Sequence, residues 1–72
     1  MIYCNIKDFA NDIIDKHDYH TDIQITYDDG HTIYYTYWDG HLFYNGQIVG
    51  WQSIYNKGAV KGKINDDKYI FR

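Results

Sequence analysis

Histidines and aspartates between His17 and Asp22 are the side chains whose types and spacing could support metal chemistry. His17, Asp18, His20 and Asp22 lie within six consecutive residues. Imidazole and carboxylate groups both bind zinc, and this spacing could hold an ion if one further ligand, such as His41, joined it. The chain offers no second cysteine and no tight carboxylate cluster. We therefore expect surface histidines at a helix-to-strand connection, and no bound metal or cofactor.

Cys4 is the candidate nucleophile, because it precedes a predicted helix whose dipole could lower the pKa of the thiol. A nucleophile also needs a base within hydrogen-bond reach, and His17 stands at the far end of the same helix, about three turns away. Ser53 is the only serine. The glycines sit in predicted hairpins and not between a strand and a helix, where a phosphate-binding loop would place them. We therefore expect no enzymatic activity.

Length and composition indicate one small domain over residues 1–72. A chain of 72 residues buries only a modest fraction of its surface, so its stability is marginal unless a partner adds to it. A single cysteine rules out a disulfide within the chain and is typical of a reducing compartment. We see no signal-peptide pattern and no apolar run that approaches a membrane span. The expected location is the cytoplasm.

Charge is distributed unevenly along the sequence. Residues 1–30 carry seven aspartates and two lysines, a local charge of −5, whereas residues 53–72 carry five basic residues and two aspartates, a local charge of +3. Such asymmetry can orient a partner or a second copy of the chain. Glutamate and proline are absent, and the frequent residues Ile, Tyr, Asn, Asp and Lys all have AT-rich codons. That composition indicates an AT-rich genome, such as that of a low-GC bacterium or its phage.

The segment from Asn5 to His17 has the pattern of an amphipathic helix. Asn5 is a favourable N-cap, and Asp8 stands in the first turn, where a carboxylate suits the free amides and the helix dipole. Apolar residues recur at i, i+3, i+4, i+7 and i+8, the stripe that a helix turns toward a core. The stripe comprises Ile6, Phe9, Ala10, Ile13 and Ile14.

Three tight turns predict a four-stranded antiparallel meander after this helix. A two-residue turn at Asp29-Gly30 would set the isoleucines of the first strand on a face with threonines. A three-residue loop over residues 28–30 pairs Ile25 with Ile33 and gives one apolar face, so we expect the three-residue loop. Asp39-Gly40 and Asn45-Gly46 are typical of two-residue type I′ turns. The predicted core face comprises Ile23, Ile25, Tyr27, Ile33, Tyr35, Tyr37, Leu42, Tyr44, Val49 and Trp51.

The C-terminal third has weaker periodicity. The segment KYIFR predicts a short closing strand, paired with the segment AVKGKI. The expected fold class is α+β, with one N-terminal amphipathic helix packed on an antiparallel β-meander of four to six strands.

The opposite face of the predicted sheet is also rich in aromatic residues. A single helix cannot cover both faces, which leaves two alternatives. Either residues 53–72 fold over this second face, or the face remains available as a contact surface. We favour the contact surface, because tyrosine and tryptophan tolerate water until a partner arrives. The predicted partner-binding residues are Tyr34, Trp38, His41, Phe43 and Ile48.

Aspartates along the predicted helix form a second candidate surface. Successive members of the set rise by about 5–6 Å along the helix, a spacing comparable to the phosphate step of a nucleic-acid strand. Such a row could occupy the basic groove of a nuclease or repressor, although a solvated face of this kind is common on amphipathic helices. The acidic face comprises Asp8, Asp12 and Asp15, followed by Asp18 and Asp22.

These features favour a non-enzymatic protein-binding module. We expect a small inhibitor or accessory factor of a phage or other mobile element that occludes a host protein. A host protein with a basic surface, one that acts on nucleic acid or in defence, is the kind of target that fits. One alternative is a homo-oligomeric module, such as a dimer, that buries the second sheet face against a copy of itself. Another is a binder of single-stranded nucleic acid, since aromatic side chains on a sheet can stack on bases. The net charge of −3 argues against direct nucleic-acid binding.

Overall fold

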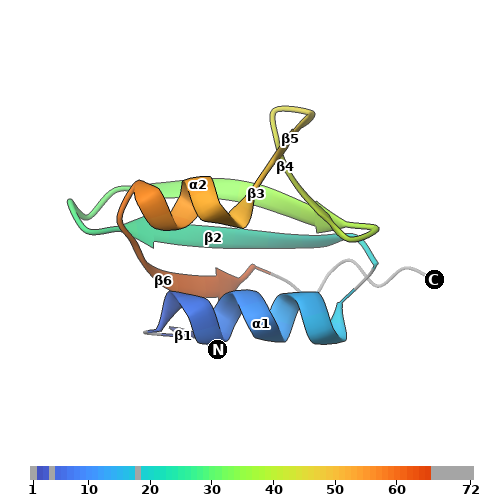
Figure 1. Ribbon diagram of the computed structural model, residues 1–72, viewed down its shortest axis with the longest axis horizontal. Helices are drawn as coiled ribbons and strands as arrows, with labels where there is room; N and C mark the ends of the chain where they lie inside the picture. The colour runs from blue at the N-terminus through green and yellow to red at the C-terminus, as the bar shows by residue number, and fades with distance from the viewer. Residues whose placement is uncertain (1, 4, 18, 66–72) are drawn as a thin grey trace.

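The chain forms two helices and a six-stranded antiparallel sheet, an α+β fold, in a computed structural model that describes residues 2–3, 5–17 and 19–65 (Figure 1). The strands follow the order β1-β6-β2-β3-β4-β5 across the sheet. The elements are β1 (Ile2–Tyr3), α1 (Ile6–Lys16), β2 (Thr21–Tyr27), β3 (Thr32–Trp38), β4 (His41–Tyr44), β5 (Gln47–Val49), α2 (Trp51–Asn56) and β6 (Ala59–Ile64).

The predicted N-terminal helix is confirmed as α1. The side chain of Asn5 caps it, accepting hydrogen bonds from the backbone N–H groups of Lys7 and Asp8 at 3.0 and 3.1 Å. Phe9 and Ile13 are fully buried against the sheet. Ile14 does not share that burial: it is 53% exposed, because it lies on the flank of the helix that turns away from the sheet.

The predicted meander is also confirmed, register included. Gly30 has a φ of +94°, and β2 pairs with β3 through Ile25 and Ile33, as the three-residue loop requires. The turns at Asp39-Gly40 and Asn45-Gly46 have positive φ at both central residues, the geometry of type I′ hairpins. The sheet face that these registers predict to be apolar is the one that forms the core. Tyr44, expected in this core, is 44% exposed on the β4–β5 hairpin.

The C-terminal third differs from the prediction. Trp51, expected to continue a strand, begins α2, and its ring meets that of Phe9 edge-on at a centroid distance of 6.4 Å. The AVKGKI segment is strand β6, as expected, but its partners are β2 and β1. The proposed partner strand KYIFR lies outside the described residues.

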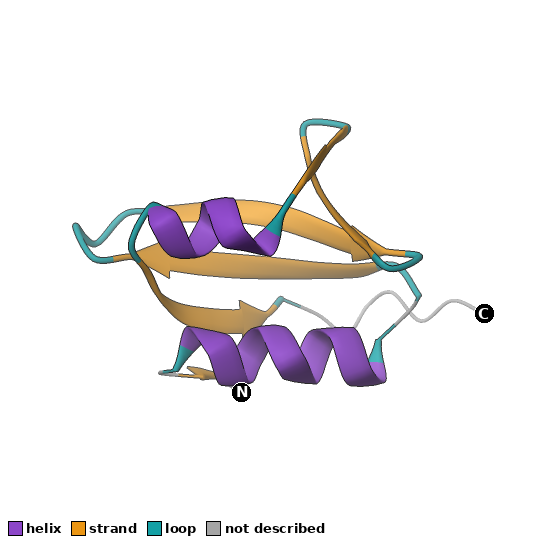
Figure 2. Cartoon of the chain, in the orientation of Figure 1, coloured by secondary structure: helices purple, strands orange, loops and turns teal. Residues whose placement is uncertain are grey.

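Both helices cover the same face of the sheet (Figure 2). The two helices contact each other through the rings of Phe9 on α1 and Trp51 on α2. The ammonium of Lys7 on α1 also lies 5.5 Å from the centre of the Tyr55 ring on α2. The segment from Trp51 to Ile64 therefore adds to the core and to the sheet, and it does not fold over the second face. The rest of the segment that could have covered this face, residues 66–72, lies outside the described residues. Neither helix of the described residues is long and apolar enough to cross a membrane.

Candidate functional site: the open face of the sheet

The side of the sheet opposite α1 and α2, here called the open face, carries all five residues predicted to bind a partner. Because side chains alternate along a strand, the buried residues of β3 and β4 leave the intervening ones on this side. Cross-strand pairs set Trp38 beside His41 and Phe43 beside Ile48. The structure therefore brings Tyr34, Trp38, His41, Phe43 and Ile48 together on one surface.

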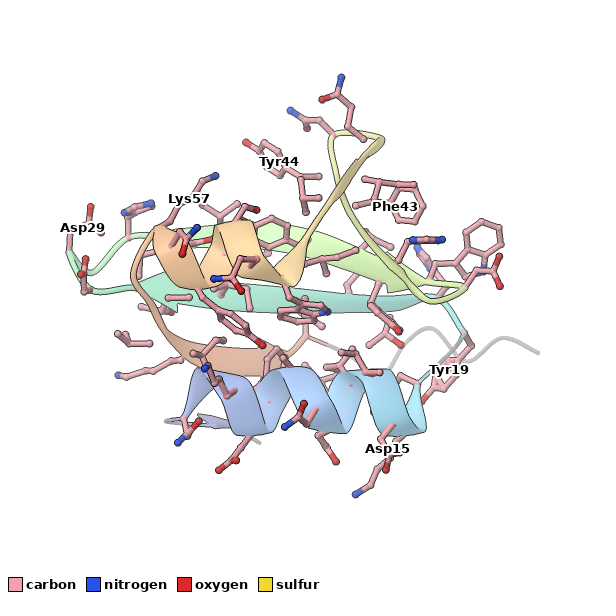
Figure 3. All side chains as sticks on the ribbon, in the orientation of Figure 1. Asp15, Tyr19, Asp29, Phe43, Tyr44 and Lys57 are labelled. Atoms are coloured by element: carbon pink, nitrogen blue, oxygen red, sulfur yellow. The ribbon has the colours of Figure 1, made fainter. Side chains whose placement is uncertain are left out.

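Three of these side chains are largely in water. Tyr34 is 59% exposed, Trp38 52% and Ile48 61%. Phe43 is half-buried, and the ring of His41 meets it at right angles with a centroid distance of 6.4 Å. Figure 3 shows Phe43 and Tyr44 on opposite sides of the β4–β5 hairpin. Phe43 therefore belongs to the open face and Tyr44 to the face that the helices cover. Several large apolar side chains exposed on one face of a sheet are unusual for a small domain.

Two lysines that were not predicted to lie there also reach the open face. Pairing of β6 with β2 sets Lys63 opposite Gln24 and Lys61 opposite Thr26. Gln24 is in turn opposite Tyr34, so Lys63 and Tyr34 lie on the two flanks of β2. Alternation of Lys61, Gly62, Lys63 and Ile64 is the sequence signal that could have placed the lysines on the solvent side of a strand.

The five aspartates of the predicted acidic face do not form one surface. Asp8, Asp12 and Asp15 lie along α1, on the other side of the molecule from the open face, and the carboxylate of Asp12 pairs with Lys16 Nζ at 2.8 Å. Asp18 lies outside the described residues. Asp22 does not extend the row, because strand alternation turns it onto the open face between buried Thr21 and Ile23.

Asp22 places a carboxylate on the open face. Its carboxylate accepts a hydrogen bond from the hydroxyl of Thr36 at 3.2 Å, and the Nε2 atom of His20 lies 3.8 Å away. The side chain retains about a third of its exposure, 32%. A carboxylate accepts several hydrogen bonds, so Asp22 keeps acceptor capacity for a further group.

The histidines make separate contacts. His17 Nδ1 is 2.9 Å from the hydroxyl of Tyr19, His31 contacts the carboxylate of Asp29, and His41 faces Trp38 across the hairpin. Among residues 5–17 and 19–65, no three His, Cys, Asp or Glu side chains converge on a point that could hold a metal. Two members of the candidates considered above, Cys4 and Asp18, lie outside the described residues, and the expectation of no metal stays a prediction.

Comparison with known proteins gives no relative. No protein-family model, no curated protein and no solved structure matches this chain. The properties of the open face are therefore the basis for a functional assignment.

Proposed function

We propose that the chain is a non-enzymatic protein-binding module, an inhibitor or accessory factor that occludes a surface of its partner with the open face. The observation that carries the proposal is the exposure of Tyr34, Trp38 and Ile48, each more than half in water, on the one sheet face that neither helix covers. Trp and Tyr are the residues on which binding energy most often concentrates at protein interfaces.

The size of the molecule is compatible with this use. A specific interface takes roughly 800 Å² from each partner. The accessible surface of the chain is 4641 Å², so one face of the sheet is enough for an interface of ordinary size. Energy at such an interface depends on a few anchors, and Trp38, paired with His41 and one residue pair from Phe43, is the candidate anchor of this face.

A capture experiment with matched variants tests the proposal. The immobilised wild type, Trp38→Ala and Ile14→Ala are each exposed to a lysate of a low-GC bacterium, and bound proteins are identified by mass spectrometry. Ile14 is the control, because it is exposed to the same degree but lies on α1. We expect a protein that both the wild type and Ile14→Ala retain and that Trp38→Ala loses, with affinity reduced by about 2–4 kcal/mol.

Light scattering on the purified chain separates this proposal from self-association. A wild-type dimer that Trp38→Ala converts to a folded monomer would assign the open face to a second copy. A monomeric wild type that Trp38→Ala unfolds, with no captured protein lost, would contradict the proposal and make the open face part of the folding core.

Single-stranded nucleic acid is a second candidate ligand, favoured by the placement of Lys61 and Lys63 on the open face. Stacking platforms combine exposed aromatic rings with positive charge along the backbone path, and Tyr34 stands across β2 from Lys63. Asp22 on the same face and the net charge of −3 oppose this ligand.

Tryptophan fluorescence titration with oligo-dT at several salt concentrations tests the second candidate. Binding should quench Trp38, weaken steeply with salt, and fall in a Lys61→Gln/Lys63→Gln variant. No quenching at low salt, or binding equal in the double variant, would eliminate it.

A further inference from the structure

One edge of β3 is unpaired along half of its length. The pairing of β3 with β4 runs from Trp38 and His41 to Thr36 and Phe43, and there it stops. Beyond this point the β4–β5 hairpin diverges from β3, as Figure 1 shows. Among the described residues no strand lies beside β3 between Thr32 and Tyr35 on this side.

The register shows which main-chain groups this edge presents. The N–H of Tyr27 donates to the carbonyl of His31, so His31 and every second residue after it bond toward β2. Thr36 and Trp38, of the other parity, bond toward β4. Thr32 and Tyr34 share that parity, and their N–H and C=O groups therefore point to the unpaired side, where both residues are exposed.

A hollow of about 210 Å³ lies where the hairpin separates from β3. On the helix side, Tyr35 and Tyr44 close it with their rings 5.6 Å apart. On the open face, Tyr34, Thr36 and Phe43 line it, with Asp22. Ligand pockets for cofactors or drug-sized molecules usually measure about 300–1,000 Å³. This hollow is therefore of a size for a single side chain.

The hollow carries negative charge from a carboxylate. Of the described residues that line it, Asp22 alone is charged, and its side chain is 32% exposed. A lysine or arginine side chain is the complementary occupant, while an acidic one would be repelled.

Protection that edge strands usually have is missing from this segment. Exposed edge strands are commonly protected against pairing with another chain by lysine, by proline or by their very short length. The outer strand β5 has three residues, but Thr32–Tyr35 carries neither lysine nor proline and belongs to a strand of seven. An open edge beside a side-chain-sized hollow is the arrangement that peptide recognition by strand addition uses.

We infer that the edge of β3 between Thr32 and Tyr35 accepts an extended peptide as an additional strand, with one basic side chain of the peptide seated in the hollow at Asp22. The added strand bonds to the main chain of Thr32 and Tyr34 and ends against the β4–β5 hairpin. This inference rests on the proposed function, since it specifies the kind of protein segment that the module recognises.

Three pools of capped pentapeptides test the inference against the isotope-labelled chain. The first pool has lysine at the centre with varied flanking residues, the second has glutamate there, and the third has lysine but N-methylated flanking amides. We expect the lysine pool to shift the NMR signals of the Thr32 and Tyr34 amides and to slow their hydrogen exchange. The glutamate pool should bind about tenfold more weakly, as for loss of one close charge pair, and the N-methylated pool should not bind.

Asp22→Asn provides the matched protein variant, because asparagine keeps the size of the side chain and an acceptor for Thr36. In this variant the lysine and glutamate pools should bind equally. No response of the Thr32 and Tyr34 amides to the lysine pool at millimolar concentration, or equal binding of the N-methylated pool, would overturn the inference.

Failure here is distinguishable from failure of the proposed function. If Trp38→Ala loses a captured protein while the edge amides ignore every peptide pool, the open face binds its partner without strand addition. If the peptides bind as expected and Trp38→Ala retains every captured protein, the edge of β3 is the recognition site and the aromatic row is not.

Discussion

The ring of Phe9 on α1 lies directly over Gly62 on β6. A methyl group added at Gly62 would come within 2.1 Å of Phe9 Cδ2 and 2.4 Å of its Cγ, distances at which atoms cannot coexist. Phe9 is completely buried, so its ring has no solvent into which it could move. Helix and strand approach this closely because the strand has no side chain at the point of contact.

Gly62→Ala should therefore destabilise the fold by about 1–3 kcal/mol, the usual cost of overpacking a core. Urea unfolding monitored by tryptophan fluorescence gives the measurement. In the double variant Phe9→Leu/Gly62→Ala the smaller side chain relieves the clash, so the loss should be less than the sum of the single losses. Additive losses would mean that the ring of Phe9 does not rest on Gly62.

Local signals in the sequence were sufficient to predict the meander and its registers. Gly30, Asp39-Gly40 and Asn45-Gly46 each fix a turn type, and a turn type fixes the pairs that follow it. The burial of alternate residues then decides between registers that differ by one residue, as at Ile25 and Ile33. Helix α1 was predictable for the same reason, since its cap and its stripe are both local.

The parts that were not predicted depend on contacts between distant residues. Helix α2 has only six residues, too few to show a period, and alternation with Val49 made Trp51 resemble the next residue of a strand. Pairing of β6 with β2 joins residues about forty positions apart, such as Gln24 and Lys63, and leaves no local pattern. The position of Lys61 and Lys63 on the open face could not be inferred without that pairing.

Two neighbouring isoleucines on α1 should respond very differently to truncation. Ile13 is fully buried in the core, whereas Ile14 is 53% exposed. Ile13→Ala should cost about 2–4 kcal/mol, which is a large part of the stability of a small domain, and Ile14→Ala should cost less than about 1 kcal/mol. Thermal unfolding by circular dichroism compares them. Equal losses would mean that α1 is rotated relative to the sheet.

The turn between β2 and β3 contains a carboxyl group with a lowered pKa. The backbone N–H of His31 donates to the Asp29 carboxylate at 3.0 Å, and the His31 ring also contacts it, so the pKa of Asp29 lies below its usual range. Stability from this group is present above the ordinary pKa of aspartate and is lost as the pH falls through the lowered pKa. Carboxyl NMR titration should find the pKa of Asp29 still lowered in His31→Ala, because the backbone donor, the larger cause, remains. A return to the ordinary value would assign the effect to the imidazole.

The three aspartates of α1 should matter to binding more than to folding. Asp8 interacts with the helix dipole and Asp12 with Lys16, surface effects of about 0.3–1 kcal/mol each at most. Replacing Asp8, Asp12 and Asp15 with asparagine should leave the melting temperature within a few degrees of wild type. If the captured partner is basic, its affinity should fall and lose its salt dependence. Unchanged affinity at low salt would exclude the acidic face of α1 from the interface.

The buried hydroxyl pair of Tyr27 and Tyr35 should make the fold sensitive to alkali. The two oxygens lie 2.5 Å apart, and burial, followed by the hydrogen bond to Tyr35, raises the pKa of Tyr27 above its ordinary value. Because the pKa of Tyr27 is raised on folding, its contribution to stability is complete below about pH 10 and is lost as the pH rises from there toward the folded-state pKa.

Tyr27→Phe removes this titration, but it leaves the buried hydroxyl of Tyr35 without that partner, at a cost of about 1–3 kcal/mol near neutrality. Urea unfolding between neutral and strongly alkaline pH should therefore show two curves that converge as the wild type loses stability faster. Tyr34→Phe is the control for loss of a tyrosine hydroxyl, since the Tyr34 side chain is 59% exposed and the stability near neutrality should stay that of the wild type. Parallel curves for the wild type and Tyr27→Phe would show that Tyr27 ionises as readily in the folded chain as in the unfolded one.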